Sequence, residues 1–169
     1  MIMDQLFAVD ALDVALTSDD WYTPPWLFEA AGLVFDMDVA APVDPSRRTC
    51  PARAYLTPVE DGLVSPWHGL VWCNPPYSNA GPWVTRFAKH EDGGLMLTMG
   101  ARARWVGELM GAADALSLVA FPLGRPDGRM AGAGAMMILT ARGDQCVSAL
   151  ARIAAVDTQA RGAYLVRPG

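Results

Sequence analysis

Four consecutive residues near the middle of the chain, Asn74-Pro75-Pro76-Tyr77, carry groups that could hold an amine and a flat ring. Two prolines in a row fix the backbone and remove two N–H donors, so carbonyl acceptors, the Asn74 side-chain oxygen and an aromatic ring remain. An exocyclic amine needs two acceptors for its two protons, and a planar base needs a ring on which to stack. Acceptors at that place would also draw electron density toward the amine nitrogen as it attacks an electrophilic carbon. A rigid turn with a packed tyrosine is the alternative interpretation, because Pro-Pro turns are common.

The tetrapeptide directly follows a short apolar run, residues 69–73, which predicts a strand. Ligands of open α/β sheets bind beyond the carboxyl ends of the strands. The position of the tetrapeptide therefore makes it a candidate site, independently of its composition.

The rest of the chain alternates predicted strands and helices, which favours a parallel or mixed sheet covered on both faces. A helix is expected between Thr23, as its N-cap, and Gly32, with prolines in the first turn. Residues 42–53 and 122–134 are expected to be loops. The other expected helices span residues 81–90, 103–113 and 144–155, and the expected strands span residues 33–39, 55–57, 69–73, 94–99, 115–121, 135–141 and 163–166.

A length of 169 residues, 52% of them apolar and 18% charged, predicts one folded domain and excludes intrinsic disorder. We expect an acidic arm over residues 1–20 and a single domain over residues 21–169. No apolar run approaches the roughly 18 residues of a membrane span, so no membrane association is expected. The start of the chain lacks the basic region of a signal peptide. Three cysteines without a CxxC spacing argue against a disulfide framework or a metal site and favour a reducing cytoplasm.

The charge is unevenly distributed. Residues 1–46 hold nine acidic residues and no Lys or Arg, and the remainder carries a net charge of +4, giving −5 in total. That balance argues against a generic nucleic-acid coat, in which excess basic charge supplies the affinity. Twelve of the thirteen basic residues are arginines, which suit bidentate contacts with phosphate. Solvated arginines on an ordinary protein surface are the alternative.

Several spaced motifs surround the tetrapeptide, and together they carry a resemblance. Across residues 21–90 the chain resembles the phage-type DNA N-6-adenine methyltransferases (Dam-like). The matching stretches, in chain order, are Trp21-x-Thr23-Pro24-x-x-Leu27-Phe28, Phe35-x-x-Asp38-Val39-Ala40-Ala41, Asp61-Gly62-Leu63 with Pro66-Trp67, Gly69-x-Val71-Trp72-Cys73-Asn74-Pro75-Pro76-Tyr77-Ser78, and Pro82-Trp83-Val84.

The resemblance implies a Rossmann-like α/β methyltransferase fold, with a mostly parallel sheet and helices on both faces, and S-adenosylmethionine as the cofactor. It implies that Asn74 and the carbonyl of Pro75, with Pro76 beside them, hold the target amine. Tyr77 would stack on an adenine flipped out of double-stranded DNA. The residues expected to bind the cofactor are Trp21, Thr23, Pro24, Asp38, Ala40 and Asp61. The arginines expected to contact phosphates are Arg47, Arg48, Arg102, Arg125 and Arg129.

Other functions stay open. A non-catalytic phage protein on the same scaffold could bind a host protein or mimic DNA through its acidic face. The intact Asn-Pro-Pro-Tyr sequence favours an enzyme over that alternative. Single-stranded DNA or RNA could replace the duplex as acceptor, and a homodimer or a host partner could help to grip it. For an enzyme encoded by a phage, the expected compartment is the cytoplasm of the bacterial host.

Overall fold

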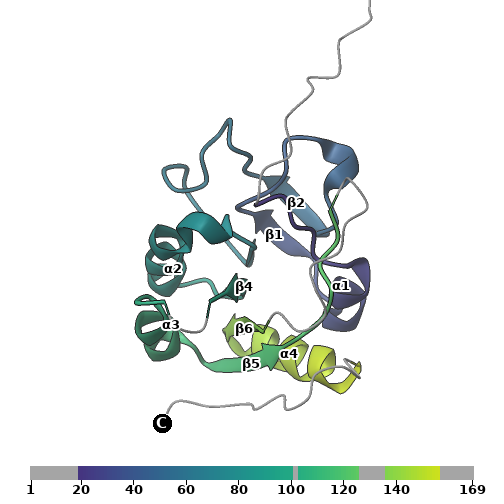
Figure 1. The fold of residues 1–169 in the computed structure, drawn as a ribbon, viewed down its shortest axis with the longest axis vertical. Coiled ribbons are helices and arrows are strands. Elements are labelled where there is room, and N and C mark those ends of the chain that lie inside the picture. Colours follow the sequence, from purple (N-terminus) through teal and green to yellow (C-terminus); the bar gives the residue numbers. More distant parts are fainter. Residues whose placement is uncertain (1–18, 101–102, 126–135, 157–169) are drawn as a thin grey trace, which may run out of the picture.

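The computed structural model describes residues 19–100, 103–125 and 136–156, and a six-stranded sheet lies at its centre (Figure 1). The strands follow one another across the sheet in the order β2-β1-β3-β4-β6-β5. Their bounds are Phe35–Asp38 (β1), Ala52–Tyr55 (β2), Val71–Cys73 (β3), Gly94–Met99 (β4), Ala115–Val119 (β5) and Met137–Arg142 (β6).

Strands β2, β1, β3 and β4 pair in parallel, whereas β6 runs antiparallel to both of its neighbours, β4 and β5. Five strands therefore end at the same side of the sheet, which we call the carboxyl edge. The mostly parallel sheet agrees with the predicted fold class. The chain passes from β1 to β2 on one side and then crosses back to β3 on the other, so the topology reverses beside β1. Ligand sites of open α/β sheets lie at such switch points.

Helices cover both faces of the sheet, as predicted (Figure 1). Helix α1 (Pro25–Ala31) packs against α4 (Asp144–Val156) on one face, and α2 (Ala80–Lys89) packs against α3 (Val106–Ala112) on the other. Each pair closes its own apolar core. Phe35, Leu97 and Leu150 lie in the core on the α1 side, and Val71 and Phe87 lie in the core on the α2 side.

Most of the expected elements form within a few residues of their predicted bounds, and two details were wrong. The strand predicted at residues 55–57 lies at Ala52–Tyr55 instead, because Met37 of β1 pairs with Ala54 and fixes the register. Thr23 is not the N-cap of α1: Pro24 occupies that position without a side-chain cap, and Thr23 is buried and contacts Asn74. The strand predicted at residues 163–166 lies outside the described residues.

The segment between β2 and β3 is packed tightly onto α2. The guanidinium of Arg86 donates to the carbonyls of Leu63 and Ser65, and it lies over the ring of Trp67. Trp67 in turn stacks near Trp83 of α2 and donates to the carbonyl of Gly62 over 2.8 Å. These contacts hold the segment against the sheet beside β1.

None of the helices in the described parts of the chain is both long and apolar enough to cross a membrane.

Candidate active site

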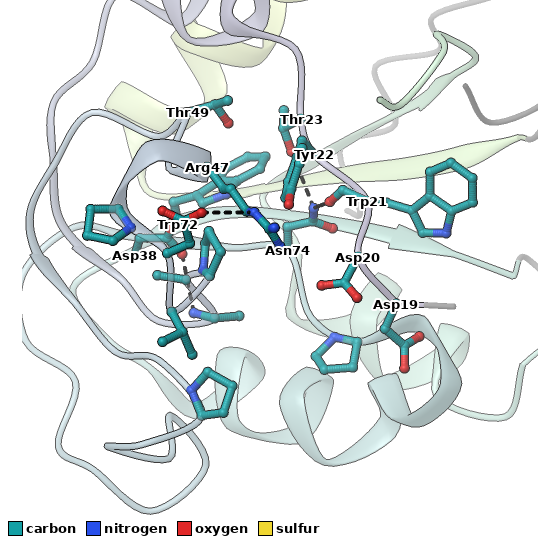
Figure 2. Close-up of a pocket in the computed structure, with 18 residues that line it drawn as sticks. Asp19, Asp20, Trp21, Tyr22, Thr23, Asp38, Arg47, Thr49, Trp72 and Asn74 are labelled. Atoms are coloured by element: carbon teal, nitrogen blue, oxygen red, sulfur yellow. Dashed lines mark hydrogen bonds and ion pairs between the residues drawn. The ribbon is translucent and has the colours of Figure 1, made fainter. Parts of the chain in front are cut away.

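A cavity of about 640 Å³ opens at the carboxyl edge, where β1 and β3 end (Figure 2). Its volume falls within the roughly 300–1,000 Å³ typical of sites for small molecules. Three stretches of chain supply most of the wall: residues 19–23 before α1, the end of β1 with residues 40–45, and the end of β3 with Asn74 and Pro76. Because β1 and β3 are adjacent and parallel, residues far apart in the sequence meet there.

The side chain of Asn74 is held in one orientation. Its Nδ2 donates to the backbone carbonyl of Trp21 over 3.2 Å and lies 3.4 Å from Oγ1 of Thr23. A carbonyl oxygen can only accept, so the amide nitrogen must face Trp21 and the amide oxygen must point the other way. That oxygen, Oδ1, is buried and accepts no hydrogen bond from any described residue.

The remainder of the tetrapeptide continues from β3 into a short 3-10 helix, Tyr77–Asn79. Pro75 is buried, whereas Pro76 reaches the cavity wall. Tyr77 is partly buried and packs against the core on the α1 side. Its hydroxyl is buried without a hydrogen-bond partner in the described part of the chain, and this burial raises the pKa of Tyr77 well above its usual value.

Asp38, the last residue of β1, places a buried carboxyl group in the cavity wall; only 4% of the residue is exposed. Burial raises the pKa of Asp38 to about 7, although the Ala40 N–H, which donates to Oδ1 over 3.2 Å, and the charge of Arg48 both act to lower it. Asp19, Asp20 and Asp44 also line the cavity. The wall is therefore rich in carboxylates, which suits a ligand that carries positive charge.

Residues 19–23, which we call the strap, run across the carboxyl edge and are tied down at several points. Asp19 accepts two hydrogen bonds from Ser78, and Tyr22 exchanges backbone hydrogen bonds with Gly124 beyond β5. The strap therefore joins the tetrapeptide to the far side of the sheet. In Figure 2 the indole of Trp21 points away from Asn74, and Arg125 lies over its ring with 5.0 Å between the guanidinium carbon and the ring centroid.

The residues predicted to bind the cofactor divide into two groups. Trp21, Thr23, Asp38 and Ala40 line the cavity, whereas Pro24 and Asp61 do not. Asp61 is an exposed turn residue with a φ of 54°, and its carboxylate accepts from the Leu63 N–H over 2.9 Å. Nothing in the described structure tests whether Asp61 contacts a bound cofactor, so that role stays a prediction.

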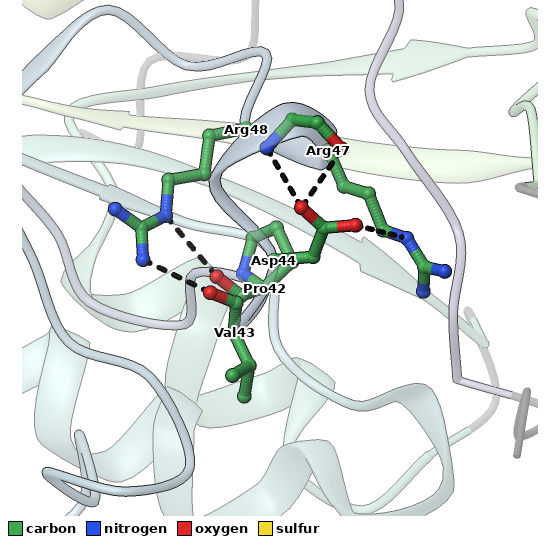
Figure 3. A network of polar contacts seen from close by, with 6 residues as sticks. Pro42, Val43, Asp44, Arg47 and Arg48 are labelled. Atoms are coloured by element: carbon green, nitrogen blue, oxygen red, sulfur yellow. Dashed lines mark hydrogen bonds and ion pairs between the residues drawn. The ribbon is translucent and has the colours of Figure 1, made fainter. Parts of the chain in front are cut away.

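The predicted DNA-contacting arginines have different surroundings (Figure 3). Arg47 lines the cavity and pairs with Asp44 over 3.0 Å. Arg48 donates to the carbonyls of Pro42 and Val43, each over 3.2 Å, and covers the ring of Tyr55. Arg48 thus holds the loop after β1. Arg102 and Arg129 lie outside the described residues.

Sequence reasoning missed Asp19, Asp20 and Tyr22 as parts of the site. The first two fall in the segment expected to be an acidic arm, yet both line the cavity. Their proximity to Trp21 and Thr23 in the sequence is the one signal that could have drawn attention to them. The contact between Asp19 and Ser78 joins positions 59 residues apart, and no local sequence pattern predicts it.

A family model and a phage protein are similar to parts of this chain. A family model described as DNA N-6-adenine-methyltransferase (Dam) matches residues 13–119 of the chain. The DNA N-6-adenine-methyltransferase of Haemophilus phage HP1 (strain HP1c1) is 36% identical over 73 residues. The matched stretch covers 40% of this chain and 40% of the phage protein, so the similarity spans less than half of that relative's length.

Proposed function

The chain belongs to the DNA N-6-adenine-methyltransferase (Dam) family, and we propose that it transfers the methyl group of S-adenosylmethionine to the exocyclic amine of adenine in DNA. The observation that carries the proposal is the amide oxygen of Asn74, a buried acceptor without a donor in the described structure. Leaving such a group unsatisfied costs about 1–3 kcal/mol, which an incoming amine proton recovers.

The cavity residues fit the proposed cofactor. S-adenosylmethionine carries an ammonium and a sulfonium, and four aspartates line the cavity. The buried carboxyl group of Asp38 receives one hydrogen bond from the backbone, which leaves its second oxygen for a ligand. In this proposal Asp38, Thr23 and the backbone at Trp21 and Ala40 hold the cofactor. When bound, S-adenosylmethionine supplies a methyl carbon whose bond to sulfur breaks as the bond from the amine nitrogen forms.

The protein's part in the reaction is to hold and polarise the amine. Asn74 Oδ1 and the carbonyl of Pro75 each accept a hydrogen bond from one of its two N–H groups, so the nitrogen lone pair is directed away from both acceptors. Positive charge develops on that nitrogen during transfer, and two fixed acceptors stabilise it without reorganising. Holding the amine in line also lowers the entropic cost of the reaction. One amine proton then passes to water.

The target adenine must leave the base stack to reach this site, which costs a few kcal/mol. We propose that Tyr77 stacks on the flipped base and offsets part of that cost, because the residue is aromatic, only partly buried and directly follows Pro76 of the cavity wall. Arg47 lines the cavity and Arg125 lies over the Trp21 ring of the strap, and we propose that both contact phosphates. For Arg102 and Arg129, which lie outside the described residues, the phosphate contact stays a prediction. We place the activity in the cytoplasm of a bacterial host, where DNA and the cofactor are both present.

The test is transfer of labelled methyl from S-adenosylmethionine to unmethylated duplex DNA and to single strands, followed by nucleoside analysis. We expect label in N6-methyladenine, and a decrease of about 100- to 1,000-fold in the Asn74→Ala variant, the size found for removal of one catalytic acceptor or donor. Asn79→Ala is the matched control. Asn79 is exposed, lies in the same turn and caps α2 without a side-chain hydrogen bond.

Wild-type rates in a folded Asn74→Ala protein would contradict the mechanism. No transfer to either form of DNA, together with no cofactor binding in calorimetry, would favour the non-catalytic binding protein instead.

A further inference from the structure

We propose that Asp19 is a positioning residue: its carboxylate clamps the turn after the tetrapeptide and thereby keeps the Asn74 amide oriented toward the amine. The inference rests on the proposed function and adds to it a residue outside the Asn-Pro-Pro-Tyr sequence. Asp19 and Ser78 are joined by two hydrogen bonds, which tie the strap to the turn at Tyr77–Asn79.

The clamp has two points of contact. Oδ1 of Asp19 accepts from the Ser78 N–H over 3.0 Å, and Oδ2 accepts from the Ser78 hydroxyl over 2.6 Å. Two hydrogen bonds from one residue to one carboxylate fix direction as well as distance, and bonds to an ionised acceptor are shorter and stronger than neutral ones. Ser78 directly follows Tyr77, so the clamp acts on the residues that would touch the base.

The strap transmits this contact to Asn74. The N–H of Trp21 donates to the carbonyl of Asp19 over 2.9 Å, which makes a tight turn at the start of the strap. The carbonyl of Trp21 then receives Nδ2 of Asn74 over 3.2 Å. Asp19 thus sets where the Trp21 carbonyl lies, and that carbonyl sets which way the Asn74 amide faces.

Asp92 offers a matched control at the opposite edge of the sheet. Its carboxylate accepts from the N–H of Gly69 over 2.8 Å, two residues before β3 begins. Asp19 and Asp92 therefore hold the two ends of the same stretch of chain through backbone N–H groups, and both contacts are exposed. A contribution to stability alone would make both substitutions behave alike.

The experiment compares Asp19→Ala, Asp19→Asn, Ser78→Ala and Asp92→Ala in the full chain. It measures kcat, the KM for S-adenosylmethionine and amide hydrogen exchange at Asn74 and at residues 77–79. We expect Asp19→Ala to lower kcat about 10- to 100-fold, the scale of small misplacements, while the KM changes less than about threefold. Asp19→Asn restores most of kcat, because its oxygen still accepts from the Ser78 N–H and its amide nitrogen donates to the hydroxyl.

Ser78→Ala removes only the hydroxyl contact, so we expect a smaller loss of kcat, and it provides the test if Asp19→Ala does not fold. Exchange of the Ser78 amide accelerates in Asp19→Ala and stays at the wild-type rate in Asp92→Ala. If the wild-type protein is active and kcat is unchanged in both Asp19→Ala and Ser78→Ala, the positioning role of Asp19 is overturned, whereas the proposed function stands. A wild-type protein that transfers no methyl group would overturn the proposed function and, with it, the positioning role.

Discussion

Asp38 of β1 pairs in parallel register with Trp72 of β3, and Asn74 follows two residues beyond that pair. The buried carboxyl group and the oriented amide therefore lie at the ends of neighbouring strands, where the topology reverses. This register brings a group suited to a cationic cofactor beside a group suited to an amine. Methyl transfer would require the cofactor beside Asp38 and the amine beside Asn74 to be in contact, so these two residues have to lie close together.

Tyr77 allows its ring and its hydroxyl to be tested separately. We expect Tyr77→Phe to retain methyl transfer within about threefold and to be as stable as the wild type or up to about 1 kcal/mol more stable, because the buried hydroxyl has no partner in the described structure. Tyr77→Ala should lose about 5- to 150-fold in kcat/KM for DNA, since base–aromatic stacking is worth roughly 1–3 kcal/mol. Steady-state kinetics with thermal unfolding of each variant measure both effects. An inactive Tyr77→Phe would show that the hydroxyl itself takes part.

Asp38 predicts a dependence of stability on pH. Its pKa is raised to about 7 in the folded protein, so between about pH 4 and pH 7 the folded state keeps a proton that the unfolded chain releases. The free energy of unfolding therefore falls as the pH rises through this range and levels off above pH 7. A shift of this size corresponds to roughly 4 kcal/mol at most.

Asp38→Asn removes this dependence because the amide stays neutral and can still accept from Ala40. We expect the variant to match the wild type near pH 4 and to be more stable at pH 8, while its affinity for S-adenosylmethionine decreases. Urea unfolding across this range measures the difference, and the exposed Asp92→Asn serves as control. Parallel stability curves for wild type and Asp38→Asn would contradict the assignment.

Arg47 and Arg48 are neighbours with different expected roles. Arg48→Ala should lower stability by about 1–3 kcal/mol, because it removes two hydrogen bonds to carbonyls and a contact with the Tyr55 ring. Arg47→Ala loses one partly exposed ion pair, worth less than about 1 kcal/mol, and we expect it to reduce the salt slope of DNA binding by about one. Dissociation constants at several salt concentrations give that slope. An unchanged slope in Arg47→Ala would remove this residue from the DNA interface.

Gly62, in the segment after β2, packs closely against Val39, which follows β1 beside the cavity wall. A Cβ at Gly62 would lie 2.0 Å from the carbonyl oxygen of Val39 and 2.8 Å from the ring of Trp83. We expect Gly62→Ala to destabilise the fold by about 1–3 kcal/mol and to weaken cofactor binding, because Val39 lies between Asp38 and Ala40. Gly107→Ala in α3 is the control: beyond its own helix, no atom of the described residues lies within 4 Å of a Cβ there, so it should stabilise the protein by up to about 1 kcal/mol. Thermal unfolding and calorimetry test both variants.

The order and type of the elements could be predicted because most of them bury one continuous apolar face. Residues 94–99 and 144–155 illustrate this, since they were predicted as a strand and a helix and form β4 and α4. Strand β2 was misplaced by three residues because it is short and half exposed, so its position depends on pairing with β1 rather than on its own composition.

Site residues could be predicted where a motif directly follows a predicted strand. They could not be predicted where the contact is made by a residue far away in the sequence. Asn74 directly follows a strand that the sequence predicts, so its position beyond a strand end could be predicted, whereas Asp38 was expected in the site through the family resemblance. Asp19 lies 59 residues from Ser78, in a stretch without periodicity. Arg48 shows a different limit: the sequence cannot distinguish a guanidinium that binds phosphate from one that binds backbone carbonyls of its own loop.

The bridge between Tyr22 and Gly124 ties the strap in the cavity wall to the connection after β5. Tyr22 and Gly124 exchange both backbone hydrogen bonds, and the residues on either side of Tyr22 hold the amide of Asn74. A ligand that rests on the connection after β5 and a ligand inside the cavity therefore act on the same strap. If DNA rests on that connection and the cofactor in the cavity, as proposed above, linkage requires each to change the affinity for the other by the same factor.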